Sequence, residues 1–237
     1  MASPKLTCER HGGVMTLSLN RPEKLNAIDN ELSHALLAAL DTARKDAAVR
    51  AVVLRANGRA FCAGRDVSSE PTEQDLVLVQ AVAQAIVDLP KPVVAAVHGW
   101  TVGAGLEWML DADLVLAASD ARFKLPEASL GVFVTGGLTA TLPVFAGLAR
   151  AKALIFLGEE FGAAEAQAWG LVWRVVAPDE LAAECGRVAE KLAALRPDVA
   201  ARFKRVLNEV GLHHFARAIE LENEAQRAVQ ARPIDSE

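Results

Sequence analysis

A strand-and-turn unit occurs twice in this sequence. Residues 51–64 (AVVLRANGRAFCAG) align without a gap with residues 92–105 (PVVAAVHGWTVGAG), and the matches include two valines, a turn glycine and an Ala-Gly step. Each copy predicts a buried strand, a glycine turn, a short extended piece and then a helix or loop. Successive copies of such a unit stack in space. We therefore expect the steps Ala63-Gly64 and Ala104-Gly105 to lie beside each other.

Strand-like and helix-like patterns alternate along most of the chain. Helical patterns fill the intervals between five runs rich in β-branched residues, at 14–19, 51–54, 93–97, 114–117 and 171–176. After residue 178 the patterns are purely helical and begin at Pro178, Pro197 and residue 212. This order predicts an α/β fold followed by a C-terminal helical region.

Composition argues against several classes of function. The chain has 237 residues and a net charge of −5, which argues against a nucleic-acid-binding protein or a basic protein of membrane surfaces. Residues 128–149 carry no charge and approach membrane-spanning length. Four glycines, three threonines and Pro143 interrupt this stretch, so we interpret it as a buried loop and helix and expect no membrane span.

The three cysteines, Cys8, Cys62 and Cys185, are far apart and form no CxxC pair. An odd number of cysteines without such a motif predicts a reducing compartment, with neither a disulfide framework nor a zinc site. The first ten residues lack the apolar core of a signal peptide. We therefore expect a cytoplasmic protein.

Two glutamates lie in the most apolar part of the chain. Glu107 follows the small-residue turn 103–106, and Glu127 ends the sequence Leu-Pro-Glu. A carboxyl group in an apolar setting without a basic neighbour has a raised pKa, because its charged form loses hydration. Taken singly, each glutamate is equally well explained as a solvated or helix-capping residue. Taken together, they suggest an acid/base pair that acts on water and on a proton bound to carbon.

The repeated Ala-Gly steps suggest a second part of the same site. Small residues let a ligand approach the backbone, and free N–H groups at the start of a helix can face a developing negative charge. Two stacked steps would form an oxyanion hole. Tight packing between turns of the chain explains the small residues as well.

Other patterns carry less weight. Residues 103–105 begin like a dinucleotide-binding fingerprint, but Trp108 occupies the position of its third glycine. Cys62 has no histidine motif to activate it, so we interpret it as a small buried residue. We expect His98 to satisfy a hydrogen bond in the core. Two roles, packing in the core and forming the wall of a ligand pocket, fit Trp100, Trp108, Phe133 and Val134 equally well.

A series of short motifs spans the chain from about residue 6 to the mid-230s. They are Arg21-Pro22, Leu25-Asn26-Ala27, and residues 61–66 (FCAGRD), 91–99 (KPVVAAVHG), 103–107 (GAGLE), 125–127 (LPE), 130–131 (LG), 136–137 (GG) and 166–172 (AQAWGLV). In this order they resemble the motifs of the enoyl-CoA hydratase/isomerase (crotonase) superfamily. The resemblance implies an α/β crotonase (ClpP-like) spiral of ββα units that binds an acyl-CoA thioester.

The resemblance also implies which residues bind the substrate. The thioester oxygen would be held by the backbone N–H groups of Arg65 and Ala104, and loss of one such donor typically costs about 10²–10³ in rate. Contacts to coenzyme A would come from Asn26, Ala27, and the backbone of Ala63 and Asp66. No metal or redox cofactor is implied, because coenzyme A is part of the substrate.

Hydratases of this superfamily carry both glutamates, and the separation between Glu107 and Glu127 along the chain agrees with their pattern. The resemblance therefore implies syn addition of water to a trans-2-enoyl-CoA. Glu107 would hold and help deprotonate the water that attacks the β-carbon, and Glu127 would share that water and deliver a proton to the α-carbon. The alternatives are an enoyl-CoA isomerase, a dehydratase of a hydroxyacyl-CoA, and a catalytically weak acyl-CoA-binding or scaffold homologue.

The resemblance divides the chain into two parts. Residues 1–195 would form the spiral acyl-CoA-binding core. Residues 196–237 would form a C-terminal helical trimerisation region, truncated relative to those relatives that continue into a last helix. By analogy we expect a homotrimer or a dimer of trimers. The segment between Asp66 and Pro90 is short for the family, and we expect it to shape the acyl pocket.

Overall fold

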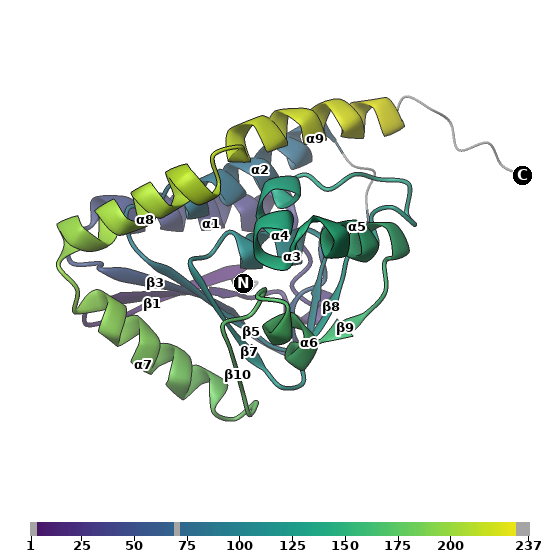
Figure 1. The fold of residues 1–237 in the computed structure, drawn as a ribbon. Coiled ribbons are helices and arrows are strands. Elements are labelled where there is room, and N and C mark those ends of the chain that lie inside the picture. The colour runs from purple at the N-terminus through teal and green to yellow at the C-terminus, as the bar shows by residue number, and fades with distance from the viewer. Residues whose placement is uncertain (1–3, 69–71, 231–237) are drawn as a thin grey trace, which may run out of the picture.

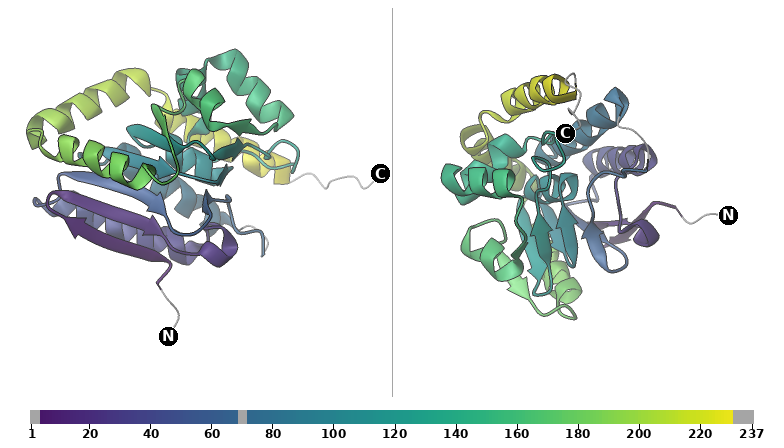
Figure 2. Two further views of the ribbon diagram at one scale, coloured as in Figure 1. Left: turned by 90° about the horizontal axis from the view of Figure 1, so that it is seen from below. Right: turned by 90° about the vertical axis from the view of Figure 1, so that its right-hand side faces the viewer.

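The computed structural model describes residues 4–68 and 72–230, and its strands form two sheets (Figures 1 and 2). The larger sheet has the order β1-β2-β3-β5-β7-β10. Its strands are β1 (Leu6–His11), β2 (Val14–Leu19), β3 (Ala51–Ala56), β5 (Val93–Val97), β7 (Leu114–Ala118) and β10 (Arg174–Val176). Only the β1–β2 pair in this sheet is antiparallel among the described strands. The smaller sheet has the order β4-β6-β8-β9, from β4 (Ala60–Cys62), β6 (Trp100–Val102), β8 (Arg122–Lys124) and β9 (Phe161–Gly162).

Successive turns of the chain contribute one strand to each sheet. Strands β3 and β4 are followed by helix α2 (Glu73–Val87), and strands β5 and β6 by helix α3 (Ala104–Leu110). Strands β7 and β8 form a third turn, which continues through a loop into helix α4 (Leu138–Ala146). This arrangement confirms the predicted α/β spiral of ββα units.

The central strands of the larger sheet, β3, β5 and β7, are buried on both faces, which explains why they are continuous apolar runs. One face packs on α7 (Leu181–Ala193) through side chains that include Val53 and Val94. The neighbouring Val52 and Leu54 point the other way, into the main core that α1 (Asn30–Lys45), α2 and α3 share. The alternation follows from the two-residue period of a strand.

The repeat predicted from the sequence is present in the parallel pairing of β3 with β5. Val52 pairs with Val93, as in the alignment of the two copies, so the predicted offset is confirmed in these strands. A register shift between Ala60 and Cys62 then interrupts the pairing of β4 with β6. Beyond it, Cys62 pairs with Thr101. The offset between Val52 and Val93 would instead have paired Cys62 with Gly103.

The two Ala-Gly steps lie beside each other, as predicted, but the register shift displaces one along the other by two positions. A Cβ atom placed on Gly64 would lie 3.9 Å from the backbone nitrogen of Ala104. Gly105 instead packs against Cys62, whose Cβ would lie 2.6 Å from a Cβ on Gly105. Because the register has moved by two positions, the position equivalent to Gly64 is Gly103.

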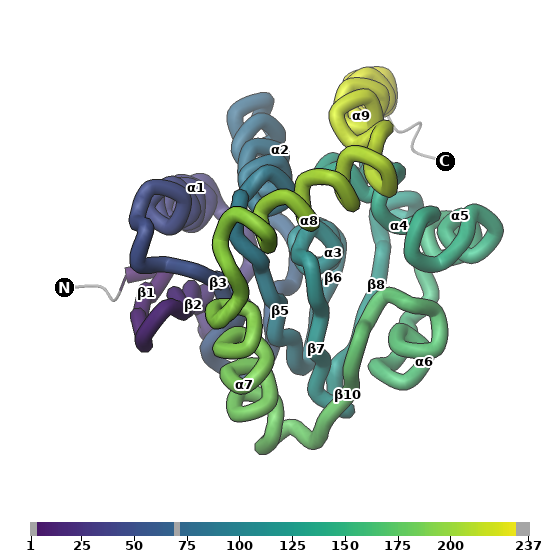
Figure 3. The backbone as a smooth tube through the Cα atoms, turned by 60° about the vertical axis from the view of Figure 1, so that its left-hand side comes forward, coloured from purple at the N-terminus to yellow at the C-terminus, as the bar shows by residue number. Residues whose placement is uncertain are grey.

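The remaining helices are α5 (Leu148–Leu157), α6 (Ala163–Ala168), α8 (Pro197–Gly211) and α9 (Phe215–Gln230), and a short 3-10 helix covers Pro22–Lys24. The helices expected near Pro178, Pro197 and residue 212 correspond to α7, α8 and α9. Helix α9 lies beside α4 and above the spiral (Figure 3). The predicted boundary at residue 195 falls between α7 and α8, and the division into two parts stays a prediction.

The strand expected over residues 171–176 is shorter than predicted, because its first half ends a helix. The N–H groups of Leu171 and Val172 both donate to the carbonyl of Ala166, at the C-terminus of α6. Only Arg174–Val176 remain to pair with β7.

The uncharged stretch 128–149 forms a loop, α4 and the first residues of α5, which agrees with the interpretation as a loop and helix. Within residues 4–68 and 72–230, no helix is both long and apolar enough to cross a membrane.

The close approach of Gly105 to Cys62 predicts a specific loss of stability. Replacing Gly105 with Ala should lower the free energy of unfolding by about 1–3 kcal/mol, because the new Cβ has backbone and side-chain neighbours that must move. The matched control is Gly186→Ala in α7, where a Cβ has no neighbour within 4 Å. That variant should gain about 0.5–1 kcal/mol from helix propensity. Urea unfolding measures both, and equal stability of the two variants would contradict this packing.

Candidate active site

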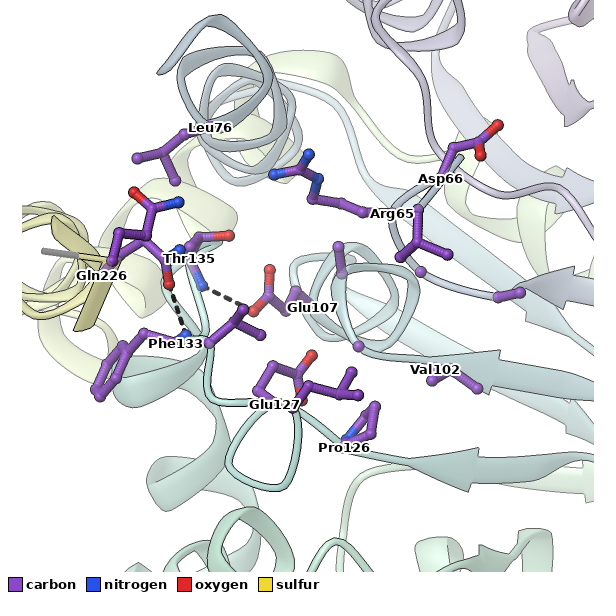
Figure 4. Close-up of a pocket in the computed structure, with 18 of the residues that line it drawn as sticks. Arg65, Asp66, Leu76, Val102, Glu107, Pro126, Glu127, Phe133, Thr135 and Gln226 are labelled. Atoms are coloured by element: carbon purple, nitrogen blue, oxygen red, sulfur yellow. Dashed lines mark hydrogen bonds between the residues drawn. The ribbon is translucent and has the colours of Figure 1, made fainter. Parts of the chain in front are cut away.

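A cavity of about 640 Å³ opens where the three turns of the spiral meet α9 (Figure 4). Its floor comes from residues 63–66 after β4 and from residues 102–104 at the start of α3. The loop of residues 126–135 closes one side, and α2 and α9 close the other. Apolar side chains in the wall include Leu76, Val132 and Phe133. The cavity therefore combines an apolar wall with exposed backbone at two turns.

Glu107 lies in the first turn of α3 and points into this cavity (Figure 4). The residue is only 1% exposed. The N–H of Thr135 donates to its Oε1 atom at 2.9 Å, and its Oε2 atom has no hydrogen-bond partner among the described residues. A Cβ atom on Gly136 would lie 2.7 Å from that free oxygen, so a side chain there would displace it.

Glu127 reaches the same cavity from the loop that follows β8. It is 9% exposed, and its Oε2 atom has no hydrogen-bond partner in the described part of the chain. A Cβ atom on Gly103 would lie 2.5 Å from its Oε1 atom. The glycine that begins α3 therefore also leaves room for the second carboxyl group.

Burial governs the protonation of both glutamates. Desolvation raises the pKa of Glu127 to about 7. Desolvation also raises the pKa of Glu107 well above its usual range, and the nearby carboxylates of Glu127 and Glu222 add to the rise. The backbone N–H of Thr135 partly opposes it, because it stabilises the charged form. The pair therefore retains at least one proton near neutral pH.

Two backbone amides lie next to these carboxyl groups. Gly64 (φ +88°) precedes Arg65, and Gly103 (φ +51°) precedes Ala104. A positive φ favours glycine, and the two glycines adopt it at equivalent positions of neighbouring turns of the spiral. The N–H groups of Arg65 and Ala104 donate in none of the backbone hydrogen bonds that connect elements in residues 4–68 and 72–230. Both residues line the cavity, so the arrangement could receive a developing negative charge.

Of the four residues expected to contact coenzyme A, two line the cavity and two do not. Ala63 and Asp66 line the cavity, but their N–H groups donate to the carbonyls of Leu25 and Ile28. Asp66 also pairs through its carboxylate with Arg21 at 2.9 Å.

Asn26 and Ala27 are buried and are not among the residues that line the cavity. The Asn26 amide donates to the carbonyls of Asn57 and Ala60, and its Oδ1 atom accepts the N–H of Arg21. These bonds hold the first loop against the spiral, and its contact with coenzyme A stays a prediction.

Several side chains that the sequence left open are now placed. Cys62 is fully buried, and burial raises the pKa of its thiol to about 12, which suits a packing role. His98 makes the expected hydrogen bond, with Nε2 2.8 Å from the Gly58 carbonyl, but at a half-buried position and not in the core as expected. Of the four apolar candidates for the pocket wall, Phe133 lines the cavity, whereas Trp100, Trp108 and Val134 do not.

Sequence reasoning missed two residues that complete the cavity. Thr135 contributes its backbone N–H to Glu107, and Gln226 of α9 lines the wall from a distant part of the chain. Backbone donors leave no side-chain signal. Gln226 lies on an amphipathic helix, where a polar residue is usually solvated.

Comparison with known proteins places these features in one family. Residues 9–233 match the family model described as enoyl-CoA hydratase/isomerase. The chain is 35% identical over 225 residues to the 1,2-epoxyphenylacetyl-CoA isomerase of Escherichia coli, which covers 91% of this chain and 86% of that protein. It is 32% identical over 224 residues to the short-chain-enoyl-CoA hydratase of Clostridium acetobutylicum, covering 92% and 86%.

Solved structures agree with the sequence comparison. The crystal structure of an enoyl-CoA hydratase from Mycobacterium avium subsp. paratuberculosis superimposes with a TM-score of 0.91 at 30% identity, over 97% of this chain and 91% of that one. The match extends across both sheets and the C-terminal helices. With its spiral of ββα units, the chain belongs to the enoyl-CoA hydratase/isomerase (crotonase) family.

Proposed function

We propose that this protein is an enoyl-CoA hydratase that adds water syn across the double bond of a trans-2-enoyl-CoA. The observation that carries the proposal is the meeting of two buried carboxyl groups, Glu107 and Glu127, in one cavity (Figure 4). Beside them lie the backbone amides of Arg65 and Ala104. Hydration needs a base for water, an acid for carbon and an acceptor for negative charge, and these groups supply all three.

The proposed reaction moves two protons and forms two bonds. Glu107 accepts a proton from water while the water oxygen bonds to the β-carbon. Electrons of the double bond move onto the thioester oxygen, where the N–H groups of Arg65 and Ala104 stabilise the enolate. Glu127 then donates a proton to the α-carbon, and the thioester carbonyl is restored. The apolar wall holds the acyl chain and limits entry of other water.

This mechanism requires the charge on Glu107 and the proton on Glu127. Within the cavity Glu127 is the more exposed of the two, and desolvation raises the pKa of both carboxyl groups. A water molecule that contacts both groups can pass the proton between them, and the Thr135 N–H favours charge on Glu107. Because the two groups titrate as a pair, loss of the single charge below about pH 7 should remove activity.

The substrate class follows from the family. Acyl-CoA thioesters would enter past residues 63–66, with coenzyme A near the first loop and the acyl chain against Leu76 and Phe133. As proposed, the reaction uses no metal or redox cofactor, because coenzyme A arrives with the substrate. All three cysteines are free thiols. This supports the proposal that the protein works in a reducing compartment such as the cytoplasm.

An isomerase is the second candidate, because one relative at 35% identity is named as an isomerase of a CoA thioester. Double-bond migration needs a proton removed at one carbon and returned at another, which one carboxyl group can perform. Dehydration of a hydroxyacyl-CoA is the reverse of the proposed reaction. Binding without turnover is the remaining alternative.

Isosteric substitution of the two glutamates tests the proposal. With crotonyl-CoA as substrate, Glu107→Gln and Glu127→Gln should each lower kcat by about 10²–10⁴-fold, because each removes one proton-transfer group and keeps the shape of the cavity. Loss of the conjugated thioester absorbance follows the reaction. Glu190→Gln, at an exposed position of α7, is the matched control and should keep full activity.

The outcomes separate the candidates. A fully active Glu127→Gln variant would contradict the hydratase mechanism. If Glu107→Gln alone is inactive and a 3-enoyl-CoA is isomerised, the protein is an isomerase. If the wild type binds acyl-CoA tightly but turns none over, the binding alternative replaces the proposal.

We also propose that the protein assembles as a homotrimer or as a dimer of trimers. Helix α8 exposes an apolar stripe at helical spacing, made of Val199, Phe203, Val206, Leu207 and Val210. A second exposed apolar patch lies on α4 and α5 and comprises Val144, Phe145, Leu148, Phe156 and Leu157. Figures 1 and 3 show α8 and α5 on different sides of α4. Two distinct patches suit head-to-tail contacts, and such contacts close into rings.

The apolar stripe of α8 predicts how assembly can be broken. Phe203 is 66% exposed, and its replacement by Asp should shift the protein from trimers toward monomers, because a charge cannot be buried unpaired in an apolar interface. Light scattering coupled to size-exclusion chromatography gives the mass of each species. Arg202→Asp, the neighbouring exposed residue of the same helix, is the control. A wild-type protein that is monomeric at micromolar concentration would contradict this proposal.

A further inference from the structure

The loop that precedes α4 is held by side chains rather than by a strand. Four alternate N–H groups donate to side-chain oxygens, at Phe133, Thr135, Gly137 and Thr139. The acceptor for Thr135 is Glu107, whereas the acceptors for the other three belong to α9. The N–H that orients the catalytic carboxyl group therefore lies between contacts to the C-terminal helix.

Glu222 of α9 accepts hydrogen bonds from two of these residues, Gly137 and Thr139. Its Oε2 atom accepts the Gly137 N–H at 2.8 Å, and its Oε1 atom accepts the N–H and the hydroxyl of Thr139 at 2.8 and 2.7 Å. The residue is fully buried. Gly137, at the N-cap position of α4, has no side chain, and Phe215 fills the space that one would occupy. Glu222 thus performs the capping that the local sequence lacks.

Gln226 lies one turn further along α9, on the same face as Glu222. Its Oε1 atom accepts the Phe133 N–H at 2.6 Å, and its side chain lines the cavity (Figure 4). Together the two residues fix the segment on both sides of Thr135. Between them, the Thr135 N–H is 2.9 Å from Oε1 of Glu107.

Other contacts of α9 point away from the loop. Asn223 and Gln80 of α2 exchange hydrogen bonds through their side-chain amides. Arg227 pairs with Glu73, also on α2. The docking of α9 on α2 and its hold on the loop therefore involve different side chains, so the two can be separated by substitution.

We propose that Glu222 and Gln226 are positioning residues for Glu107, which they orient through the backbone of residues 133–139. This inference rests on the proposed function only for its kinetic consequences. Neither side chain is assigned a proton transfer. Their role is to keep the Thr135 N–H where it fixes the Glu107 carboxyl group relative to the water and to Glu127.

A double-mutant cycle tests the positioning role. Glu222→Gln keeps one acceptor oxygen but places an amide against a backbone donor, so kcat should fall about 10-fold or more. KM should change little, because Glu222 does not line the cavity. In a Glu107→Gln background the same substitution should have no further effect on kcat, since its action passes through Glu107. An equal loss of kcat in both backgrounds would overturn the proposal.

Three further variants keep this experiment decisive. Gln226→Met removes one acceptor at nearly constant volume, and its loss of kcat should also disappear when Glu107 is Gln. Glu224→Gln is the matched control for Glu222→Gln, because it is an exposed position of the same helix. Asn223→Ser weakens the contact with α2 and should leave kcat within about 2-fold. A loss with Asn223→Ser as large as with Glu222→Gln would assign the effect to helix docking and overturn the proposal.

A crystal structure of the Glu222→Gln protein separates this inference from the proposed function. The proposal expects the distance from the Thr135 nitrogen to the Glu107 carboxyl oxygen to lengthen beyond hydrogen-bonding range. An unchanged contact would overturn the positioning role, whatever reaction the enzyme catalyses. If the wild type does not hydrate enoyl-CoA but this contact breaks in the variant, the hydratase proposal fails and the positioning role stands. If Glu222→Gln does not fold, the structure of Gln226→Met tests the same distance, because Gln226 holds the other end of the segment.

Discussion

The parallel pairing of β3 with β5 is the constraint on which the site depends. It places two turns of the spiral side by side, and the register shift between Ala60 and Cys62 sets which residues of those turns meet. As a result Gly64 and Gly103 are neighbours, each with a positive φ and each followed by a residue that lines the cavity. Without the shift the partner of Gly64 would be Gly105, which packs against Cys62 instead.

The carboxyl groups depend on this backbone arrangement. Glu107 lies in the first turn of the helix that follows β6, and Glu127 fits only because Gly103 has no side chain. Burial in the resulting cavity is what raises both pKa values, since neither carboxyl group forms a salt bridge within the described residues. Packing, rather than a nearby cation, therefore sets the protonation of the pair, as the proposed acid/base chemistry requires.

Much of this fold could be predicted from the sequence, because buried parallel strands leave continuous β-branched runs. The repeat that pairs Val52 with Val93 was found in this way, whereas the two glutamates were found from their apolar setting and from the motifs around them. The register shift could not be predicted, because nothing in residues 60–62 distinguishes a shifted strand from a regular one. The roles of Glu222 and Gln226 were also hidden. Their partners are backbone N–H groups in a distant part of the chain, and each looks like a solvated residue on an amphipathic helix.

Burial keeps a proton on the Glu107–Glu127 pair near neutral pH. Carbon NMR of the free protein, with labelled glutamate carboxyl groups, measures this directly, and Glu107→Gln and Glu127→Gln assign the two signals. We expect the Glu127 signal to titrate near pH 7 and the Glu107 signal to titrate well above the ordinary range for a glutamate. Titration of both signals near the ordinary value of about 4.3 would contradict this expectation.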